Sequence, residues 1–241
     1  MSENSTQLPD TAAQSTASIF LPLIDNGGGA IRANFLLSIL RGFRDRDIHI
    51  DRFSDSLPSR ARNRAAAHFL RETKRDYILF IDSDIIFDKH HIDFLMESDE
   101  PILAGIYCKK SKGIEPCLNT LPGHQETQCG GYQEIARAGT GFLRIHRSVL
   151  EKMKDVGESD PNWAKHYVNH GNDEWDFFAV GVVNKEYLSE DWYFCDKARG
   201  LGYKIMLDTR IQLRHEGSAI YPLEETIEKL NDGKVNVEQA S

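Results

Sequence analysis

Two carboxylates stand where an apolar run of the chain ends. Residues 77–81 are all apolar or aromatic, and Asp82, Ser83 and Asp84 follow directly. The run is short and rich in β-branched and aromatic residues, which predicts a strand covered on both faces of a sheet. Ligands of open α/β sheets gather at the carboxyl ends of such strands. Hard oxygen ligands placed there suit Mg²⁺ or Mn²⁺, which proteins commonly hold with one or two carboxylates plus substrate phosphates.

The spacing of the acidic pair is weak evidence by itself, because Asp residues are also common in surface turns. Its position strengthens the metal interpretation, since the pair follows a predicted buried strand and residues 85–87 beyond it are apolar again. Two carboxylates this close repel each other unless a cation neutralises them. We therefore predict that Asp82 and Asp84 belong to a cation site.

Three arginines precede this strand in a predicted helix over residues 59–72. Arg60 and Arg64 are four residues apart and share a helix face, whereas Arg62 points elsewhere, so the three guanidinium groups do not meet. A solvated basic face is one interpretation. The other is anion binding, because a helix N-terminus attracts phosphate and Arg binds it with two parallel hydrogen bonds. We favour a nucleotide or diphosphate role for at least one of the three.

Glu190 and Asp191 open a second predicted helix, over residues 188–199. Acidic residues in a first turn are favoured by the helix dipole alone. Alternatively, one of the two carboxylates is a general base that accepts a proton from an attacking hydroxyl. The residue types do not choose between these two interpretations.

His215 follows a predicted short strand over residues 211–214. A lone His is more often structural than a ligand. Together with Asp84, however, it would complete a mixed imidazole and carboxylate site, which suits Mn²⁺ better than Mg²⁺.

Two further segments have two interpretations each. Gly139, Thr140 and Gly141 form either a tight turn or a stretch of backbone that lies flat beneath a sugar. Lys109 and the lysine after it either neutralise phosphate or solvate a loop.

The order of the predicted elements indicates the fold class. A strand over 18–24, a helix over 30–43, a strand over 49–53, the helix over 59–72 and the strand over 77–81 predict a doubly wound, largely parallel sheet. The second half of the chain contains shorter elements. We expect strands at 101–107, 135–138, 142–146, 204–207 and 211–214, helices at 148–154 and 188–199, and surface loops at 109–132 and 158–174.

Composition narrows the class of protein. No apolar stretch reaches the roughly 20 residues that cross a bilayer, so no membrane insertion is expected. Residues 1–17 are predicted to be a disordered leader, and residues 223–241 an acidic tail. The four cysteines show no Cys-x-x-Cys pair, which argues against a zinc site and for reduced thiols in a cytoplasm. A net charge of −8 argues against bulk nucleic-acid binding, but residues 32–75 carry eleven basic and five acidic side chains.

In this order, the motifs resemble those of the GT-A class of nucleotide-sugar glycosyltransferases. The resemblance covers residues 18–222, and residues 57–84 look most like the small glycosyltransferase-like proteins of bacteriophages and large viruses. A more distant likeness is to Golgi mannosyltransferases with an Arg-Ala-Arg-Asn segment. The segments that carry the resemblance are Phe20 to Leu23, Ser59 to Asn63, Ile78 to Asp84, Gly139 to Phe142, Ser189 to Asp191 and His215 to Gly217.

The resemblance implies a single GT-A domain, Rossmann-like, with a mostly parallel central sheet flanked by helices. It implies a nucleotide-diphosphate sugar as donor, held through Mn²⁺ or Mg²⁺ by Asp84 and His215, with Asp82 as a further ligand that lies nearer the ribose or donor sugar. Asp191 would be the base of an inverting transfer, with Glu190 as the alternative. The other residues implied at the donor are Pro22, Asp25, Asp55, Arg60, Arg62, Asn63, Ser83, Lys109, Gly139, Thr140 and Gly141.

The chain departs from the family pattern in two places. The first strand ends in Leu-Ile-Asp-Asn-Gly-Gly-Gly instead of the commoner Pro-x-Tyr-Asn, which leaves base recognition open. Residues 109–132 and 158–174 match no family segment, and we expect them to set acceptor specificity. The acceptor could be a glycan, a protein or, given the viral resemblance, a hydroxymethylated base in phage DNA, in which case the host cytoplasm is the expected compartment.

Two other functions compete with glycosyl transfer. A nucleotidyltransferase shares the sheet and the metal carboxylates, although residues 27–32 match its Gly-rich loop only loosely. A nucleotide-sugar binding protein without turnover would keep the donor site and dispense with the base. The oligomeric state is left open by the sequence.

Overall fold

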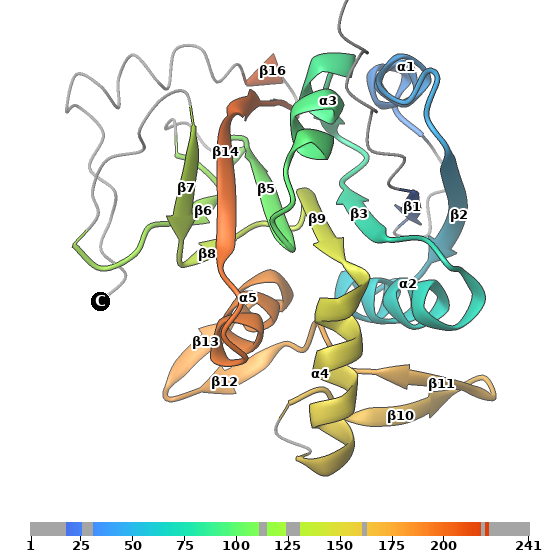
Figure 1. Cartoon of the computed structure of the whole chain (residues 1–241), viewed down its shortest axis with the longest axis vertical. Coiled ribbons are helices and arrows are strands. Elements are labelled where there is room, and N and C mark those ends of the chain that lie inside the picture. Colours follow the sequence, from blue (N-terminus) through green and yellow to red (C-terminus); the bar gives the residue numbers. More distant parts are fainter. Residues whose placement is uncertain are drawn as a thin grey trace, which may run out of the picture.

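A seven-stranded sheet forms the centre of the protein (Figure 1). The structure is a computed structural model that describes residues 18–25, 31–110, 115–123, 131–160, 163–217 and 220–221. The predicted leader, the acidic tail and the glycines at 27–29 lie outside the described residues. The strands of the sheet, in spatial order, are β2 (Ile48–Ser54), β1 (Ile19–Asp25), β3 (Tyr77–Ile81), β9 (Phe142–His146), β5 (Ile102–Ile106), β14 (Ile205–Gln212) and β7 (Tyr132–Ile135).

Five of the seven strands run in the same direction. β2 and β3 both pair with β1 in parallel, and β14 pairs with β5 in parallel. β9 lies between β3 and β5 and is antiparallel to both, while β7 is antiparallel to β14 at the edge. The mostly parallel sheet predicted from the sequence is therefore confirmed.

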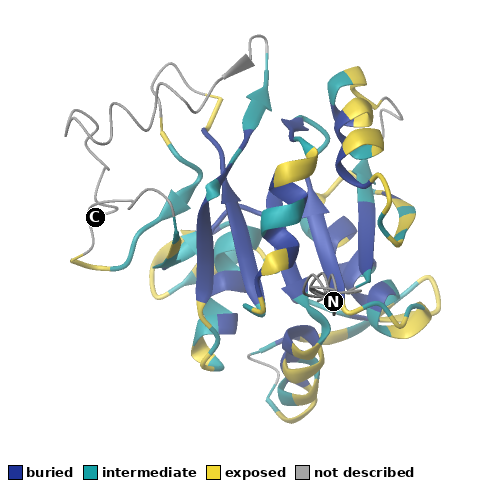
Figure 2. Ribbon diagram, turned by 45° about the horizontal axis from the view of Figure 1, so that its top comes forward, coloured by how far each residue is buried: buried dark blue, intermediate teal, exposed yellow. Residues whose placement is uncertain are grey.

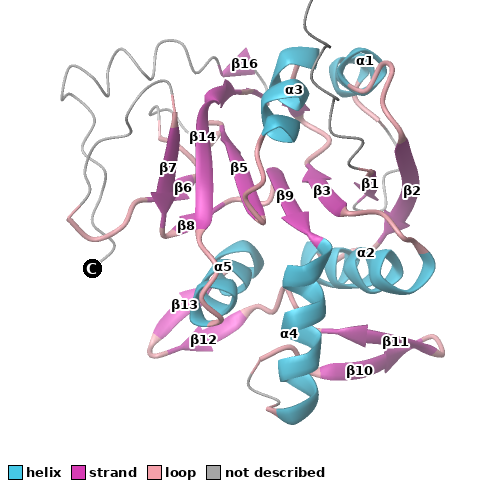
Figure 3. Ribbon diagram, viewed as in Figure 1, coloured by secondary structure: helices cyan, strands magenta, loops and turns pink. Residues whose placement is uncertain are grey.

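In the described part of the chain, five helices cover the two faces of the sheet (Figure 3). α2, α4 and α5 contribute to one buried cluster, and α1 and α3 contribute to the other. Within β3, Ile78 and Phe80 belong to the first cluster, whereas Leu79 and Ile81 belong to the second. This alternation explains why the strand is apolar throughout. The helices are α1 (Ala33–Gly42), α2 (Pro58–Glu72), α3 (Lys89–Glu97), α4 (Arg147–Ser159) and α5 (Glu190–Gly200).

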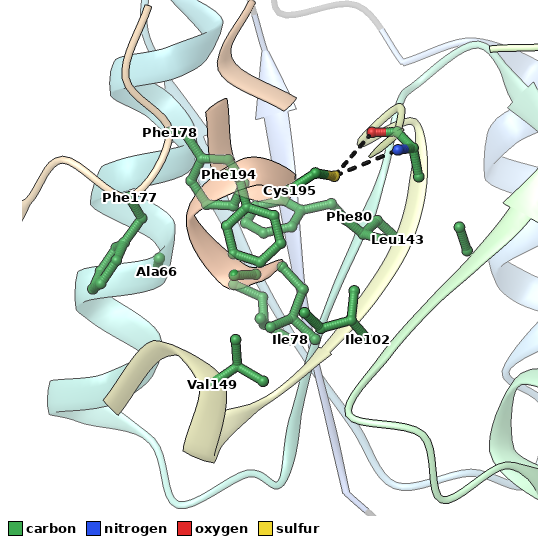
Figure 4. Close-up of a cluster of buried hydrophobic side chains, with 14 of the residues drawn as sticks. Ala66, Ile78, Phe80, Ile102, Leu143, Val149, Phe177, Phe178, Phe194 and Cys195 are labelled. Atoms are coloured by element: carbon green, nitrogen blue, oxygen red, sulfur yellow. Dashed lines mark hydrogen bonds between the residues drawn. The ribbon is translucent and has the colours of Figure 1, made fainter. Parts of the chain in front are cut away.

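Aromatic rings fill the core between the sheet and α5. Phe178 stacks on Phe194 with ring centroids 4.9 Å apart and meets Phe80 edge-on at 5.2 Å (Figure 4). Cys195 lies in the same cluster, and burial raises the pKa of its thiol to about 12. Figure 2 shows that the central strands are buried along most of their length. The core therefore holds the carboxyl edges of the strands in place.

Shorter strands form small separate sheets outside the central sheet. The pairs are β10 (His166–Asn169) with β11 (Asn172–Trp175), β12 (Gly181–Val183) with β13 (Glu186–Leu188), and β6 (Leu118–Asn119) with β8 (Arg137–Ala138), while β15 (Arg214–Glu216) lies between β16 (Ile220–Tyr221) and β4 (Ile85–Ile86). None of the described helices combines the length and apolar character that crossing a bilayer requires.

The structure corrects the predicted elements in several places: helix α3 and the β12–β13 hairpin were not predicted, and two predicted segments have different bounds. The expected loop over 158–174 contains the β10–β11 hairpin, whose turn places His170 and Gly171 at positive φ. The expected strand over 204–207 continues as β14 to Gln212, across an irregularity in its pairing with β5. In both places, polar residues form a strand because they pair with a neighbouring strand.

Candidate active site

Arg62 joins two of the predicted acidic residues. It lies near the start of α2, and 6% of its side chain is exposed. Its Nη2 donates a hydrogen bond to Asp82 Oδ1 at 2.9 Å, and its Nη1 donates one to Glu190 Oε1. Burial lowers the pKa of the Arg62 guanidinium, but the surrounding carboxylates outweigh burial and raise it. A buried, charge-assisted contact thus ties the end of β3 to the start of α5.

Asp84 forms a second cluster with His215 and Lys110. Its Oδ2 accepts a hydrogen bond from Lys110 Nζ. Its Oδ1 lies 3.2 Å from His215 Nε2, at ion-pair distance but without hydrogen-bond geometry. Burial raises the pKa of the Asp84 carboxyl group, but the interactions with His215 and Lys110 outweigh it and lower the pKa to about 2. Asp84 is therefore a carboxylate at neutral pH.

The ring of His215 is oriented by the backbone. Its Nδ1 lies 2.6 Å from the carbonyl oxygen of Cys108, and a carbonyl only accepts hydrogen bonds, so Nδ1 carries a proton. Nε2 faces Asp84: it pairs with the carboxylate when it carries a proton, and it offers a lone pair to a metal ion when it does not. Metal-binding histidines commonly donate their other ring nitrogen to a carbonyl in this way. Asp84 and His215 therefore fit the ligand set of a divalent cation, with phosphate oxygens and water to complete it.

Asp82, the third predicted ligand, pairs with Arg62 and does not join Asp84 and His215. Within the described ranges, the one group of three or more His, Cys, Asp or Glu ligand atoms that all lie within 4.8 Å of one another is Asp88, His90 and His91. That group already caps α3, because the Asp88 N–H donates to His91 Nδ1 at 3.0 Å and the Asp88 side chain accepts from the backbone of His91. The two predicted acids after β3 thus have different partners.

The backbone of residues 139–141 lies beside Asp82. The Asp82 N–H donates to the Gly141 carbonyl oxygen at 3.0 Å, and the Gly141 N–H donates to Tyr107 Oη at 2.9 Å. A Cβ would stand 2.3 Å from Tyr107 Oη at Gly139 and 2.5 Å from it at Gly141. The two glycines are needed because the tyrosine hydroxyl occupies the space of a side chain.

Tyr107 connects the two acidic clusters. It follows β5, and its ring meets the ring of His215 edge-on with centroids 5.4 Å apart. Burial raises the pKa of Tyr107 well above its ordinary value, and the carboxylate of Asp82 raises it further. Its hydroxyl is therefore a neutral donor and acceptor that fixes the buried turn containing Thr140.

Asp191 and Glu190 differ in their partners. Asp191 Oδ1 accepts hydrogen bonds from Ser189 Oγ and from the Trp192 N–H, the latter at 2.8 Å. Among the described residues, no cation contacts the Asp191 carboxylate, whereas Glu190 is paired with Arg62. A carboxylate without a cationic partner is the better proton acceptor. Of the two, Asp191 is the more suitable base.

The site lies at the carboxyl ends of three parallel strands. Asp82 follows β3, Tyr107 follows β5, and His215 follows β14 by a few residues. Ser83 lies in the turn between the two acids and is partly exposed. The sheet therefore brings together most of the residues predicted at the cation and the base.

Three of the residues predicted at the donor pair with one another or with neighbours at the edge of the sheet. Asp55 accepts hydrogen bonds of 2.7 and 2.8 Å from Arg60, which lower its pKa, and Arg64 lies 3.6 Å from it. Asp25 Oδ2 accepts a hydrogen bond of 2.8 Å from Arg52. Arg60 and Arg64 thus share a helix face, as their spacing predicts. A donor role for Asp25, Asp55 and Arg60 stays a prediction.

Asn63 and Pro22 are buried within the framework. Asn63 Nδ2 donates to Asp176 Oδ1 at 2.7 Å, and its Oδ1 accepts from the Phe178 N–H at 2.8 Å. Pro22 lies in β1 beyond the residues that pair with β3, so its missing N–H leaves no ladder position empty. Lys109 Nζ lies 3.2 Å from Glu115 Oε2. The structure gives these three residues protein partners or packing, and their predicted contact with a donor is untested.

The basic excess over residues 32–75 is largely neutralised. Eight of its eleven basic side chains form ion pairs with acidic residues. A groove for polyanionic nucleic acid needs cations that are free to contact phosphates. This part of the surface therefore offers few such cations.

No protein-family model and no curated protein match the chain. Among solved structures, A197 from STIV matches with a TM-score of 0.51 and 18% identity, over 83% of this chain and 85% of A197. The chain shares the fold of A197. Residues 1–349 of S. aureus TarS, in a complex with UDP-GlcNAc, match with a TM-score of 0.41 and 14% identity, over 88% of this chain and 63% of that one. A shared fold does not establish a reaction, which has to be argued from the site.

Sequence reasoning missed one residue of the site, Tyr107, and left the role of another, Lys110, open. Tyr107 stands directly after an apolar strand, as Asp82 does, and this position was the signal for it. Sequence reasoning considered Lys109 and Lys110 together, and two chemically identical neighbours gave no signal that Lys110 reaches Asp84 while Lys109 contacts Glu115.

Proposed function

We propose that the protein is a metal-dependent glycosyltransferase that moves a sugar from a nucleotide-diphosphate sugar to a hydroxyl acceptor. The observation that carries the proposal is the pairing of two acidic clusters at the carboxyl edge of the sheet. One cluster pairs Asp84 with a correctly oriented His215, and the other anchors Asp82 and the base-bearing helix through Arg62.

Each cluster has a task in this proposal. Asp84 and His215 hold Mn²⁺ or Mg²⁺, and such a cation stabilises charge that develops on a leaving diphosphate. Asp82 faces the ribose or the donor sugar, with its position fixed by Arg62. Glu190, held by the same guanidinium, fixes the first turn of α5 and with it Asp191.

Asp191 is the general base of the proposed reaction. Its carboxylate accepts the proton of the acceptor hydroxyl while the hydroxyl oxygen bonds to the anomeric carbon of the donor. The bond between that carbon and the diphosphate oxygen breaks, and its electron pair leaves with the nucleoside diphosphate. Attack opposite to the leaving group inverts the anomeric configuration. Because most basic residues near α2 are already paired, a glycan or protein acceptor is favoured over DNA.

Product analysis tests the reaction type. The full chain is incubated with a panel of nucleotide sugars and candidate acceptors, with Mn²⁺ or with EDTA. We expect metal-dependent release of nucleoside diphosphate. Release of pyrophosphate would instead indicate nucleotidyl transfer, and failure of every nucleotide sugar to raise the melting temperature in Mn²⁺ would contradict the proposal.

Asp191→Asn tests the base. We expect transfer to fall by about 10²- to 10⁴-fold, the usual contribution of a general base, while the melting-temperature shift caused by the donor is kept. Asp155→Asn on the exposed side of α4 is the matched control, with the same change of charge. Unchanged turnover in Asp191→Asn would show that this carboxylate is not the base.

A further inference from the structure

Lys110 forms an ion pair with Asp84, the same carboxylate that the proposed cation site would use. We propose that Lys110 is an exchangeable counter-ion: its ammonium group occupies Asp84 until a divalent cation binds there, and it then contacts the diphosphate of the donor. The inference rests on the proposed function, which supplies both the cation and the diphosphate.

The two cations of the site differ in how firmly they are held. The Arg62 side chain is 6% exposed and contacts two carboxylates. The Lys110 side chain is 34% exposed and contacts Asp84 alone among the described residues. An ammonium on a flexible four-carbon stem can change partners without leaving a buried charge behind. Lys110 is therefore able to move, whereas Arg62 is not.

A divalent cation and the ammonium group compete for the same carboxylate. Asp84 Oδ2 contacts Lys110 and Asp84 Oδ1 faces His215 Nε2, so a metal ion held by Asp84 and His215 would lie close to the ammonium group. Like charges at such a distance repel strongly where the site is partly shielded from water. Metal binding thus favours withdrawal of Lys110 from Asp84.

The donor provides the next partner for the displaced ammonium group. Lys109 is paired with Glu115, so it is not the lysine placed to contact a diphosphate beside Asp84. A diphosphate bound to the metal ion brings negatively charged oxygens close to Asp84. The ammonium group of Lys110, once displaced from Asp84, can contact these oxygens. Exchange leaves Asp84 and Lys110 each with a partner of opposite charge in both states. It also makes metal and diphosphate bind cooperatively, because metal binding releases the lysine that the diphosphate uses.

Titration calorimetry with Mn²⁺ alone and with pyrophosphate separates the two halves of the exchange. Pyrophosphate is used because every nucleotide-diphosphate sugar contains this group. In Lys110→Met, we expect Mn²⁺ to bind about fivefold more tightly, since its competitor is a partly exposed ion pair. In saturating Mn²⁺, we expect pyrophosphate to bind about tenfold more weakly, since one charge-assisted contact is lost.

Two further variants act as controls. Lys204→Met makes the same change of charge at an exposed lysine that lies 3.3 Å from Glu134, and we expect it to change neither affinity. Lys110→Arg keeps the charge and should restore most of the pyrophosphate affinity. Equal effects in Lys204→Met and Lys110→Met would reduce the result to net charge and overturn the exchange.

The outcomes also separate this inference from the proposed function. Mn²⁺ binding that disappears in Asp84→Asn but is unchanged in Lys110→Met would overturn the exchange and leave the cation site intact. Weaker Mn²⁺ binding in Lys110→Met, or unchanged pyrophosphate binding, would also overturn it. Mn²⁺ binding that persists in Asp84→Asn would overturn the cation site itself, and the exchange with it.

Discussion

Asp82 and Asp84 are two residues apart and carry the same charge, yet the protein neutralises them in different ways. Asp82 is held by Arg62, a buried guanidinium that also holds Glu190 from a distant part of the chain. Asp84 is held by Lys110, a partly exposed ammonium on a loop after β5. The first arrangement fixes the geometry of three elements, and the second can be released.

This difference follows from the chemistry of the two cations. The planar guanidinium has several donors in a fixed geometry, so it can serve two carboxylates at once and stay hydrogen-bonded when buried. The ammonium group of Lys is a compact point charge that is strongly hydrated and keeps its affinity for water. An active site that needs both a rigid frame and room for a metal ion can use one of each.

The largest expected effect is at Arg62. Arg62→Met should destabilise the protein by about 2–4 kcal/mol, because two charge-assisted hydrogen bonds of a buried guanidinium are lost, while Asp82 and Glu190 are themselves 42% and 21% exposed. Urea unfolding of the full chain measures this change in the free energy of unfolding. Arg64→Met is the matched control on the same helix, where the side chain is 36% exposed and 3.6 Å from Asp55, and it should cost no more than about 1 kcal/mol. Similar losses in both variants would show that burial does not make Arg62 more important to the fold than an exposed arginine on the same helix.

His91, which lies outside the site, should make the stability of the protein depend on pH. Burial lowers the pKa of His91 from 6.5 to about 4. Between these values the unfolded chain binds a proton that the folded protein excludes, so stability should fall as the pH drops from 6.5 to 4, by at most about 3 kcal/mol. His91→Gln should flatten this pH dependence, because Gln at the third helical position can still accept from the Asp88 N–H.

Asp84→Asn is the control for the pH dependence caused by His91. Burial raises the pKa of Asp84, but His215 and Lys110 lower it from 3.8 to about 2, so Asp84→Asn should leave the slope between pH 6.5 and about 5 unchanged and change it only below that. Chemical unfolding at a series of pH values provides both slopes. A flat profile in the wild-type protein would show that His91 is not excluded from protonation.

The contact between Tyr107 and the turn at 139–141 should produce effects of intermediate size. Gly139→Ala should cost about 1–3 kcal/mol, because its Cβ would lie 2.3 Å from the Tyr107 hydroxyl. Tyr107→Phe should relieve that clash, since the next atom, Tyr107 Cζ, is 3.3 Å away. It should not relieve Gly141→Ala, where Cζ itself is at 2.7 Å.

A double-mutant cycle measures this difference. We expect the pair of changes at 139 and 107 to cost less than the sum of the single changes. The pair at 141 and 107 should come closer to additivity, and Tyr107→Phe alone should cost about 1–3 kcal/mol because it leaves the Gly141 N–H without a partner. Equal coupling at the two glycines would mean that the hydroxyl is not what fills this space.

Much of the frame can be predicted from the sequence because it depends on local patterns. The apolar run over 77–81 fixed β3 to the residue, and the spacing of Arg60, Arg62 and Arg64 predicted that the middle one points away. The antiparallel hairpins were missed although their turns carried a signal. Both have a two-residue turn with positive φ, one at His170 and Gly171 and one at Asn184 and the residue after it, and such positions favour Gly and Asn.

The partners within the site could not be predicted, because they depend on contacts between distant parts of the chain. Arg62 was predicted at the donor, but its pairing with Asp82 and Glu190 was not foreseen, because Glu190 is 128 residues away in the sequence. Helix α3 was missed because its capping box uses His91 where Glu or Gln is usual. Which of two adjacent lysines reaches Asp84 depends on how the chain leaves β5.

The smallest expected effect is at Lys110, and it tests the contrast with Arg62 directly. Lys110→Met removes an ion pair whose two side chains are 34% and 20% exposed, so it should cost about 0–1 kcal/mol in metal-free buffer. The Arg62 side chain is itself 6% exposed, whereas the Lys110 side chain already lies partly in solvent. Urea unfolding in EDTA, with Arg62→Met measured in parallel, gives the comparison. A cost for Lys110→Met as large as that for Arg62→Met would make the lysine part of the fixed frame, and a lysine that the fold needs in place would not be free to exchange with a metal ion.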